Sequence, residues 1–314
     1  MKNEKIKLTL DDCNIVDAQD PLIVSASRAT DIPAFYCNWF FKRLAKGYVR
    51  WRNPYNGQDS YVTFANTKFI VFWSKNPRPI LPFLPMLRQK GIGCYIQYTL
   101  NDYEAEGLES GVPSLLERIE TFKRLVDESG FGSVVWRFDP LILTDSISKE
   151  DLLHKINNVA YRLRGYAEKL VFSFADISSY RKVGRNLREA RINYREWTED
   201  EMVDFSRKLA EMNLGLELAT CAEKVDLSEF GIRHNRCIDP DLICRLSPEL
   251  APIIHYLKTD KGQRTLCGCI TSKDIGTYNT CPHGCAYCYA NMSPFSARQN
   301  YLMHQHNLDN DSIL

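Results

Sequence analysis

The cysteines near the C-terminal end of the chain form the pattern with the clearest chemistry. The chain has 11 cysteines, and five of them lie between Cys267 and Cys288. The last three, Cys281, Cys285 and Cys288, are spaced as C-x-x-x-C-x-x-C. Three thiolates at these spacings can ligate three irons of one [4Fe–4S] cluster from a single loop. Gly284 inside the motif allows the backbone to curl around such a cluster.

Metal binding explains these cysteines better than disulfides do. The chain of 314 residues is long enough to fold without disulfides. Its N-terminal sequence has no apolar core of a secretion signal, and no apolar run approaches the roughly 18 residues of a membrane helix. We therefore expect a cytoplasmic protein with reduced thiols that does not associate with a membrane. The scattered cysteines are interpreted as small buried apolar residues: Cys13, Cys37, Cys94 and Cys244.

Four charged residues are the candidate catalytic groups. Arg137 and Asp139 lie inside the apolar run V-V-W-R-F-D-P, and their i, i+2 spacing places them on one face of a strand. Buried charges need partners, and such pairs are common at functional sites. An internal salt bridge that closes the fold is the alternative interpretation. Arg28 and Lys75 follow two other apolar runs and could neutralise a carboxylate or phosphate of a substrate.

The elements that position these residues can be read from hydrophobic periodicity. Near-continuous apolar runs, as in parallel strands covered on both faces, occur at residues 22–27, 69–74, 94–100, 133–139, 170–176 and 215–221. Amphipathic helices are predicted behind Ser114, Ser148 and Thr198. Asp151 and Glu201 complete capping boxes for the last two helices.

The count of strand–helix units predicts an α/β fold that is a partial (β/α)6 TIM-like barrel. A full barrel of eight units takes about 250 residues, and only about 90 residues follow the sixth strand. We expect an N-terminal extension at residues 1–20, a barrel domain at 21–258, and a cluster-binding segment at 259–314. An open doubly wound sheet is the structural alternative. The sequence contains no fingerprint for a dinucleotide or P-loop nucleotide.

Ligands of parallel α/β folds bind at the carboxyl ends of the strands. The predicted strands carry polar residues at these ends, and we expect six of them to converge on one mouth: Ser25, Lys75, Gln97, Arg137, Ser173 and Glu223.

The cysteine spacing, with Tyr287 just before the last cysteine, resembles the cluster-binding motif of radical S-adenosylmethionine enzymes. The resemblance implies that Cys281, Cys285 and Cys288 hold a [4Fe–4S] cluster with one open iron. S-adenosylmethionine would chelate that iron and be cleaved reductively to a 5′-deoxyadenosyl radical. Tyr287 would lie against the adenine, and Ser173 and Glu223 are the other candidate cofactor contacts.

The resemblance also carries a structural requirement. In that superfamily the motif follows the first strand, whereas here it lies near the C-terminus, so the last segment must fold back over the mouth. The implied partners are an electron donor such as flavodoxin or ferredoxin and a small-molecule or peptide substrate. The net charge of +1 does not indicate nucleic acid and does not exclude it.

Taken as a whole, the chain is similar to an uncharacterised bacterial family, domain of unknown function 1848. The matching segments are S-A-S-R-A-T-D-I-P-A-F-Y, V-F-W-S-K-N-P, W-R-F-D-P-L-I-L-T and the terminal cysteine segment. This resemblance supplies a class of protein and no substrate.

Three other arrangements of the cysteines remain open from the sequence. Cys269 could be the fourth ligand of a fully ligated cluster that serves electron transfer or structure. A structural zinc site could be formed by Cys267, Cys269, Cys285 and Cys288. A second cluster could be held by Cys221, Cys237, Cys267 and Cys269.

Overall fold

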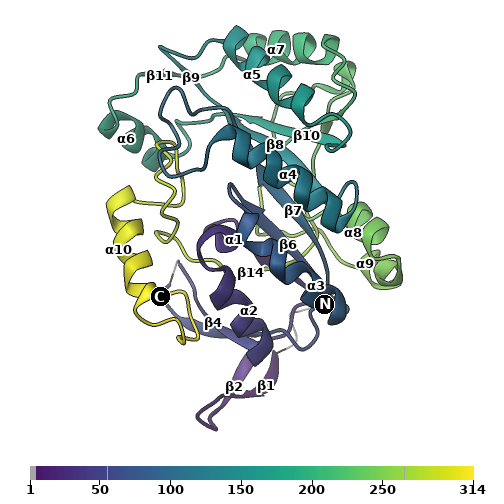
Figure 1. Ribbon diagram of the computed structural model, residues 1–314, viewed down its shortest axis with the longest axis vertical. Coiled ribbons are helices and arrows are strands. Elements are labelled where there is room, and N and C mark those ends of the chain that lie inside the picture. The colour runs from purple at the N-terminus through teal and green to yellow at the C-terminus, as the bar shows by residue number, and fades with distance from the viewer. Residues whose placement is uncertain (1–4, 55, 265) are drawn as a thin grey trace.

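The computed structural model describes residues 5–54, 56–264 and 266–314 (Figure 1). Residues 1–4 of the expected N-terminal extension lie outside the described residues. The main sheet has the strand order β13-β12-β10-β8-β7-β6-β3-β14, and every pairing in it is parallel. Its strands are β3 (Ile23–Ala26), β6 (Phe69–Ser74), β7 (Gly93–Thr99), β8 (Val134–Leu141), β10 (Lys169–Phe174), β12 (Glu217–Thr220), β13 (Arg233–His234) and β14 (Lys273–Asp274).

This topology confirms the α/β class with a parallel sheet. From β3 to β13 the order of strands in the sheet follows their order in the chain, and β14 is added beside β3. A doubly wound sheet reverses its strand order at an internal switch point. Because the order from β3 to β13 has no such reversal, the structure does not support the doubly wound alternative. The sheet is open, since no pairing in the described part of the chain joins β13 to β14.

The six predicted strands and the three predicted helices are all present. The helices are α4 (Leu115–Ser129), α5 (Lys149–Arg162) and α7 (Glu199–Glu211). Ser114, Ser148 and Thr198 cap them, and each forms a capping box with the acidic residue three positions later. These predictions succeed because a capping box and an apolar stripe are local features that do not depend on the rest of the fold.

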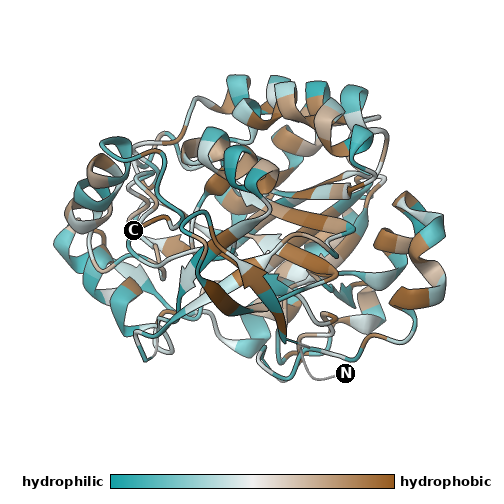
Figure 2. Cartoon of the chain, turned by 90° about the horizontal axis from the view of Figure 1, so that it is seen from below, coloured by the Kyte–Doolittle hydropathy of each residue, from teal (hydrophilic) through white to brown (hydrophobic). Residues whose placement is uncertain are grey.

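The two faces of the sheet belong to two separate hydrophobic clusters. On β8, Trp136 and Phe138 face the cluster that contains the helices α4, α5 and α7. Val135, one position before Trp136, faces the second cluster. Figure 2 shows the apolar strands in the middle of the molecule with helices packed around them. Both faces are therefore buried, as the near-continuous apolar runs predict.

The second face is covered by residues of the segments 235–264 and 266–270. The first of these segments contains α8 (Pro240–Leu246) and α9 (Ala251–Ile254). Ile243 and Ile254 from these helices share a cluster with Phe69 and Tyr95 of the sheet. The chain then pairs with β3 through β14, which brings the cysteine motif beside the first strand of the sheet.

A second sheet was not expected from the sequence. It has the order β1-β2-β5-β4, formed by β1 (Lys5–Thr9), β2 (Ile15–Gln19), β4 (Tyr48–Arg52) and β5 (Asp59–Thr63). β4 and β5, which fall in the range assigned above to the barrel, thus lie outside the main sheet, and β5 pairs with β2 of the expected N-terminal extension. The alternating burial of β1 fits a sheet with one solvated face, a weaker signal than a continuous apolar run.

The remaining elements are short or peripheral. Tyr301 and His304 of α10 (Pro294–Gln305) pack edge-on against Tyr36, between α1 (Ile32–Phe35) and α2 (Cys37–Lys46). The others are α3 (Leu84–Gln89), α6 (Arg181–Glu189), β9 (Leu143–Thr144), β11 (Tyr194–Arg195) and 3₁₀ turns at Arg78–Phe83, Ser228–Phe230 and Pro248–Leu250. Among the described residues, no helix has the length and apolar character needed to cross a membrane.

Burial predicts which aromatic residues stabilise this fold. Phe172 on β10 is fully buried, whereas Phe131 is 56% exposed. We expect Phe172→Ala to lower the free energy of unfolding by about 3–5 kcal/mol, because it leaves a cavity in the core. Phe131→Ala, the matched control, should change it by less than about 0.5 kcal/mol. Urea unfolding of both variants measures the difference, and equal losses would contradict the assigned core.

Candidate functional site

The loop that carries Cys281, Cys285 and Cys288 lies against the chain that follows β3. Thr280 Oγ1 is 2.7 Å from Thr30 Oγ1, and the Tyr36 hydroxyl donates to the Thr280 carbonyl oxygen at 2.6 Å. The C-terminal segment therefore folds back onto the carboxyl end of the first strand of the sheet, as the cysteine motif requires.

The same loop also pairs with residues 108–111, which lie between β7 and α4. The Gly111 N–H donates to the His283 carbonyl oxygen at 2.7 Å, and the Ala286 N–H donates to the Leu108 carbonyl oxygen at 2.9 Å. A Cβ at Gly111 would lie 2.6 Å from the His283 oxygen, so only glycine permits this approach. Gly284 has φ +68°, the left-handed conformation that its place in the motif suggests.

A buried histidine–aspartate pair holds the loop to the sheet. His283 Nε2 is 2.7 Å from Asp31 Oδ2, and the Lys75 N–H donates to the same oxygen at 2.8 Å. Burial alone would raise the pKa of Asp31, but the hydrogen bonds from His283, Ser74 and the Lys75 N–H lower it below its usual value. The carboxylate is therefore charged and ties the motif to the ends of β3 and β6.

The three thiols share one buried environment. Cys285 is buried, and Cys281 and Cys288 are half-buried. Burial raises the pKa of each thiol, and Asp31, Cys288 and Cys285 raise that of Cys281 further. In the described residues, no thiol–thiol hydrogen bond joins them. Three buried thiolates require compensating positive charge, which an iron–sulfur core supplies. The donor set thus fits a cluster that binds each cysteine through a different iron.

Glu109 is the centre of a buried network that sequence reasoning missed. Lys75 Nζ donates to Glu109 Oε1 at 2.6 Å, and Arg118 Nη1 is 3.4 Å from Oε2. The Tyr287 hydroxyl donates to Glu109 and accepts from Lys75 Nζ at 2.9 Å and from Asn101 Nδ2 at 3.0 Å. Burial would raise the pKa of Glu109, but Lys75 and Arg118 lower it. Nothing in the sequence distinguishes Glu109 from an ordinary loop glutamate.

This network includes Lys75, which is expected from the sequence to neutralise an anionic group of a substrate. Its ammonium is instead paired with Glu109, and its side chain is only 16% exposed. The charge of Lys75 is therefore used inside the protein, where it joins the cysteine loop to the sheet through Tyr287.

Arg137 and Asp139 form the internal salt bridge that was the alternative interpretation. Arg137 Nη2 pairs with Asp139, and Nη1 donates to Gln97 Oε1 at 3.3 Å. Arg137 is 4% exposed, so its charge lies inside the protein, beside these partners. The Asp139 N–H donates to Asn101 Oδ1 at 2.9 Å, which connects this pair to the network around Glu109.

Three more of the residues expected at the mouth lie on or just after strands of the main sheet: Ser173, Glu223 and Ser25. The Ser173 hydroxyl donates to Asp139, and Glu223 accepts from the Phe174 N–H at 3.0 Å. Burial, with a contribution from Asp139, raises the pKa of Glu223 to about 7. Ser25 lies on β3, and its hydroxyl donates to Asp274 of β14 at 2.7 Å.

Arg28 keeps a donor that the fold does not use. Its guanidinium lies over Trp73, 4.8 Å from the ring centroid, and Nη1 is 4.0 Å from Asp274 Oδ2. Nη2 is buried and has no hydrogen-bond partner in the part of the chain that the structure describes. A buried guanidinium nitrogen without a partner is costly, so Arg28 remains a candidate for binding an anion.

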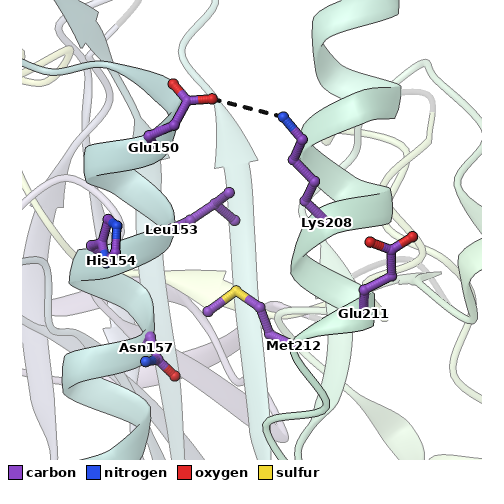
Figure 3. Close-up of a pocket in the computed structure, with 7 residues that line it drawn as sticks. All are labelled: Glu150, Leu153, His154, Asn157, Lys208, Glu211 and Met212. Carbon is purple, nitrogen blue, oxygen red and sulfur yellow. Dashed lines mark ion pairs between the residues drawn. The ribbon is translucent and has the colours of Figure 1, made fainter.

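Two pockets lie away from these residues. One, of about 430 Å³, lies between α5 and α7, where Glu150 and Lys208 pair at 3.7 Å across it (Figure 3). The other, of about 310 Å³, is lined by the amino ends of β8 and β10 and contains the Glu168–Arg245 pair. Neither pocket contains a candidate site residue. As the side chains lie, no three or more His, Cys, Asp or Glu of the described residues form a group that could hold a metal ion.

A family model matches most of the chain. The family described as "Domain of unknown function (DUF1848)" matches residues 23–290, which include the parallel sheet and the cysteine loop. No curated protein and no solved structure matches the chain.

The buried network around Glu109 predicts a large loss on removing its carboxylate. Glu109→Ala leaves Lys75 and Arg118 without their shared partner, and we expect the free energy of unfolding to fall by about 3–5 kcal/mol. Glu211→Ala removes an exposed carboxylate paired with Arg207 and should cost less than about 1 kcal/mol. Urea unfolding of the two variants tests this, and a Glu109→Ala loss as small as that of Glu211→Ala would contradict the described network.

Proposed function

The chain belongs to the DUF1848 family, and we propose that it is an iron–sulfur enzyme of the radical S-adenosylmethionine type. One observation carries the proposal: three cysteines of one buried loop lie against the residues that follow β3, at the carboxyl end of a parallel sheet. This is the edge at which parallel α/β folds bind their ligands.

Cys281, Cys285 and Cys288 would hold a [4Fe–4S] cluster, and the iron without a cysteine would take S-adenosylmethionine. Such a cluster supplies the electron that cleaves the sulfonium of S-adenosylmethionine reductively. Water has limited access to the donor sulfurs, because Cys285 is buried and Cys281 and Cys288 are half-buried. Exclusion of water strengthens the electrostatic contacts of a site and limits side reactions of a reactive product.

Residues outside the motif would act as positioning residues. The His283–Asp31 pair and the pairing of residues 283–286 with residues 108–111 hold the loop at two places. Tyr287, directed by Lys75 and Glu109, holds the backbone between the last two cysteines. These contacts would restrain the loop before any cofactor binds, and such restraint lowers the entropic cost of binding.

The other candidate residues keep narrower roles in this proposal. Arg28 would bind a carboxylate or phosphate through its free Nη2. Asp139, with its partners Arg137 and Ser173, would shape the adjoining wall of the site together with Glu223. The strand order supports a partial (β/α)6 barrel as the framework. An electron donor such as flavodoxin or ferredoxin, and a small-molecule or peptide substrate, complete the proposal.

Iron content and a cofactor-dependent spectrum test this function. Protein prepared without oxygen should contain iron and acid-labile sulfide, and replacing Cys281, Cys285 or Cys288 with Ala should remove most of the cluster iron. Cys94→Ala, a cysteine on β7 outside the motif, is the matched control and should keep it. Adding S-adenosylmethionine to the reduced protein should change the electron paramagnetic resonance of the cluster and yield 5′-deoxyadenosine slowly.

Two results would overturn the proposal. An unchanged resonance with no nucleoside product would indicate a fully ligated cluster that serves electron transfer or structure. Retention of all cluster iron in the Cys281→Ala, Cys285→Ala and Cys288→Ala variants would place the iron elsewhere in the protein.

A further inference from the structure

Four cysteines outside the motif come together beside the sheet. Cys221 directly follows β12, Cys237 follows β13, and Cys267 and Cys269 precede β14. The sulfurs of Cys221 and Cys237 are 3.6 Å apart, and those of Cys267 and Cys269 are 3.1 Å apart. The two pairs are in turn adjacent, because the Cys237 N–H donates to Cys269 Sγ at 3.1 Å. Three segments that are distant in sequence thus place four thiols in one small volume.

The groups around these thiols are those that stabilise thiolates. Cys269 Sγ also accepts from the Ile238 N–H at 3.2 Å, so two backbone donors point at one sulfur. Arg137 Nη1 is 3.3 Å from Cys237 Sγ, and Arg264 Nη2 is 3.5 Å from Cys221 Sγ. Backbone N–H groups and guanidinium groups both favour negative charge on sulfur. Arg137 is buried and also pairs with Asp139, so its guanidinium lies between a carboxylate and the Cys237 sulfur.

We propose that Cys221, Cys237, Cys267 and Cys269 bind a single thiophilic metal ion, with zinc as the ion of best fit. Zinc takes four cysteine ligands in a tetrahedron with Zn–S bonds of about 2.3 Å, which places the sulfurs about 3.8 Å apart. The Cys221–Cys237 separation of 3.6 Å is close to that value, and the Cys267–Cys269 separation of 3.1 Å would have to widen. A cubane spreads its cysteines further apart, because each of them binds a different iron.

The binding step balances in atoms and charge. Zn²⁺ and four thiols give a tetrathiolate complex of charge −2 and release four protons to solvent. Arg137 and Arg264 together carry +2 and lie beside two of the ligands. As the side chains lie, the thiols contact one another and do not surround a common centre. Metal binding therefore replaces the two thiol–thiol contacts through rotation of the cysteine side chains.

The site would join the segments that cover the second face of the sheet. Cys221 extends a strand of the sheet itself, whereas Cys267 and Cys269 stand a few residues before β14. A metal ion at this place fixes the chain that leads to Cys281, Cys285 and Cys288 without ligating any of them. The inference is thus separate from the proposed function, and it stands on different cysteines.

Metal analysis of the full chain tests the inference. Wild-type protein expressed with zinc and purified without added iron should contain about one zinc ion per chain. Cys221→Ser and Cys237→Ser should lose most of it, and Cys281→Ser and the control Cys94→Ser should keep it. Cobalt in place of zinc should give the visible bands of tetrahedral coordination and thiolate-to-cobalt charge transfer. In the wild type, zinc should also protect the four cysteines from alkylation, as peptide mapping shows.

The wild-type measurements keep the test decisive even if the serine variants fail to fold. Absence of zinc together with absence of the cobalt bands would overturn the proposal. So would a disulfide between Cys221 and Cys237, or iron and sulfide that depend on these four cysteines. A protein that holds zinc here and yet fails to respond to S-adenosylmethionine would retain this site and lose only the proposed function.

Discussion

Both faces of the parallel sheet have to be buried, and this constraint arranges the rest of the protein. Helices α4, α5 and α7 cover one face. The other is covered by residues of the segments 235–264 and 266–270, which include the short helices α8 and α9. After crossing this second face, the chain forms β14, which pairs with β3 at the edge of the sheet. The residues that follow β14 therefore start near the carboxyl end of β3. The route of the chain thus brings cysteines from the last quarter of the sequence to residues from its first half.

Buried charged side chains determine where the C-terminal cysteine loop packs against the sheet. Glu109 lies between Lys75 and Arg118 and accepts from Tyr287 of the cysteine loop. Buried ion pairs add little net stability compared with apolar contacts, but removing one partner is costly. A loop displaced from this position would leave Glu109 without the Tyr287 hydroxyl and Asp31 without His283. The network therefore favours one docked arrangement over alternatives of similar hydrophobic burial.

The cysteines divide into groups with different donor geometry. Cys281, Cys285 and Cys288 share a buried environment without the thiol–thiol contacts that join Cys221 to Cys237 and Cys267 to Cys269. Spaced thiols suit a polynuclear cluster, and thiols in contact suit a single ion. Cys269 contacts Cys237 and Cys267, so it belongs to the second group of cysteines. This placement does not favour Cys269 as the fourth ligand of a cluster held by Cys281, Cys285 and Cys288. Under the two proposals, different cysteines of one chain would hold two distinct metal centres.

The sequence by itself determined the six strands, the three capped helices and the three-cysteine motif. Each of these depends on residue types within a short stretch of chain. Examples are the capping box that begins at Ser148 and the glycine at position 284, where φ is positive. Tertiary structure alone decided that β5 pairs with the N-terminal strand β2, that Arg137 is buried, and that Glu109 joins the cysteine loop. It also decided which cysteines lie together, since Cys221 and Cys269 are separated by 48 positions in the sequence. The physical reason is that hydrophobic periodicity shows that a face must be buried but not which distant segment will bury it.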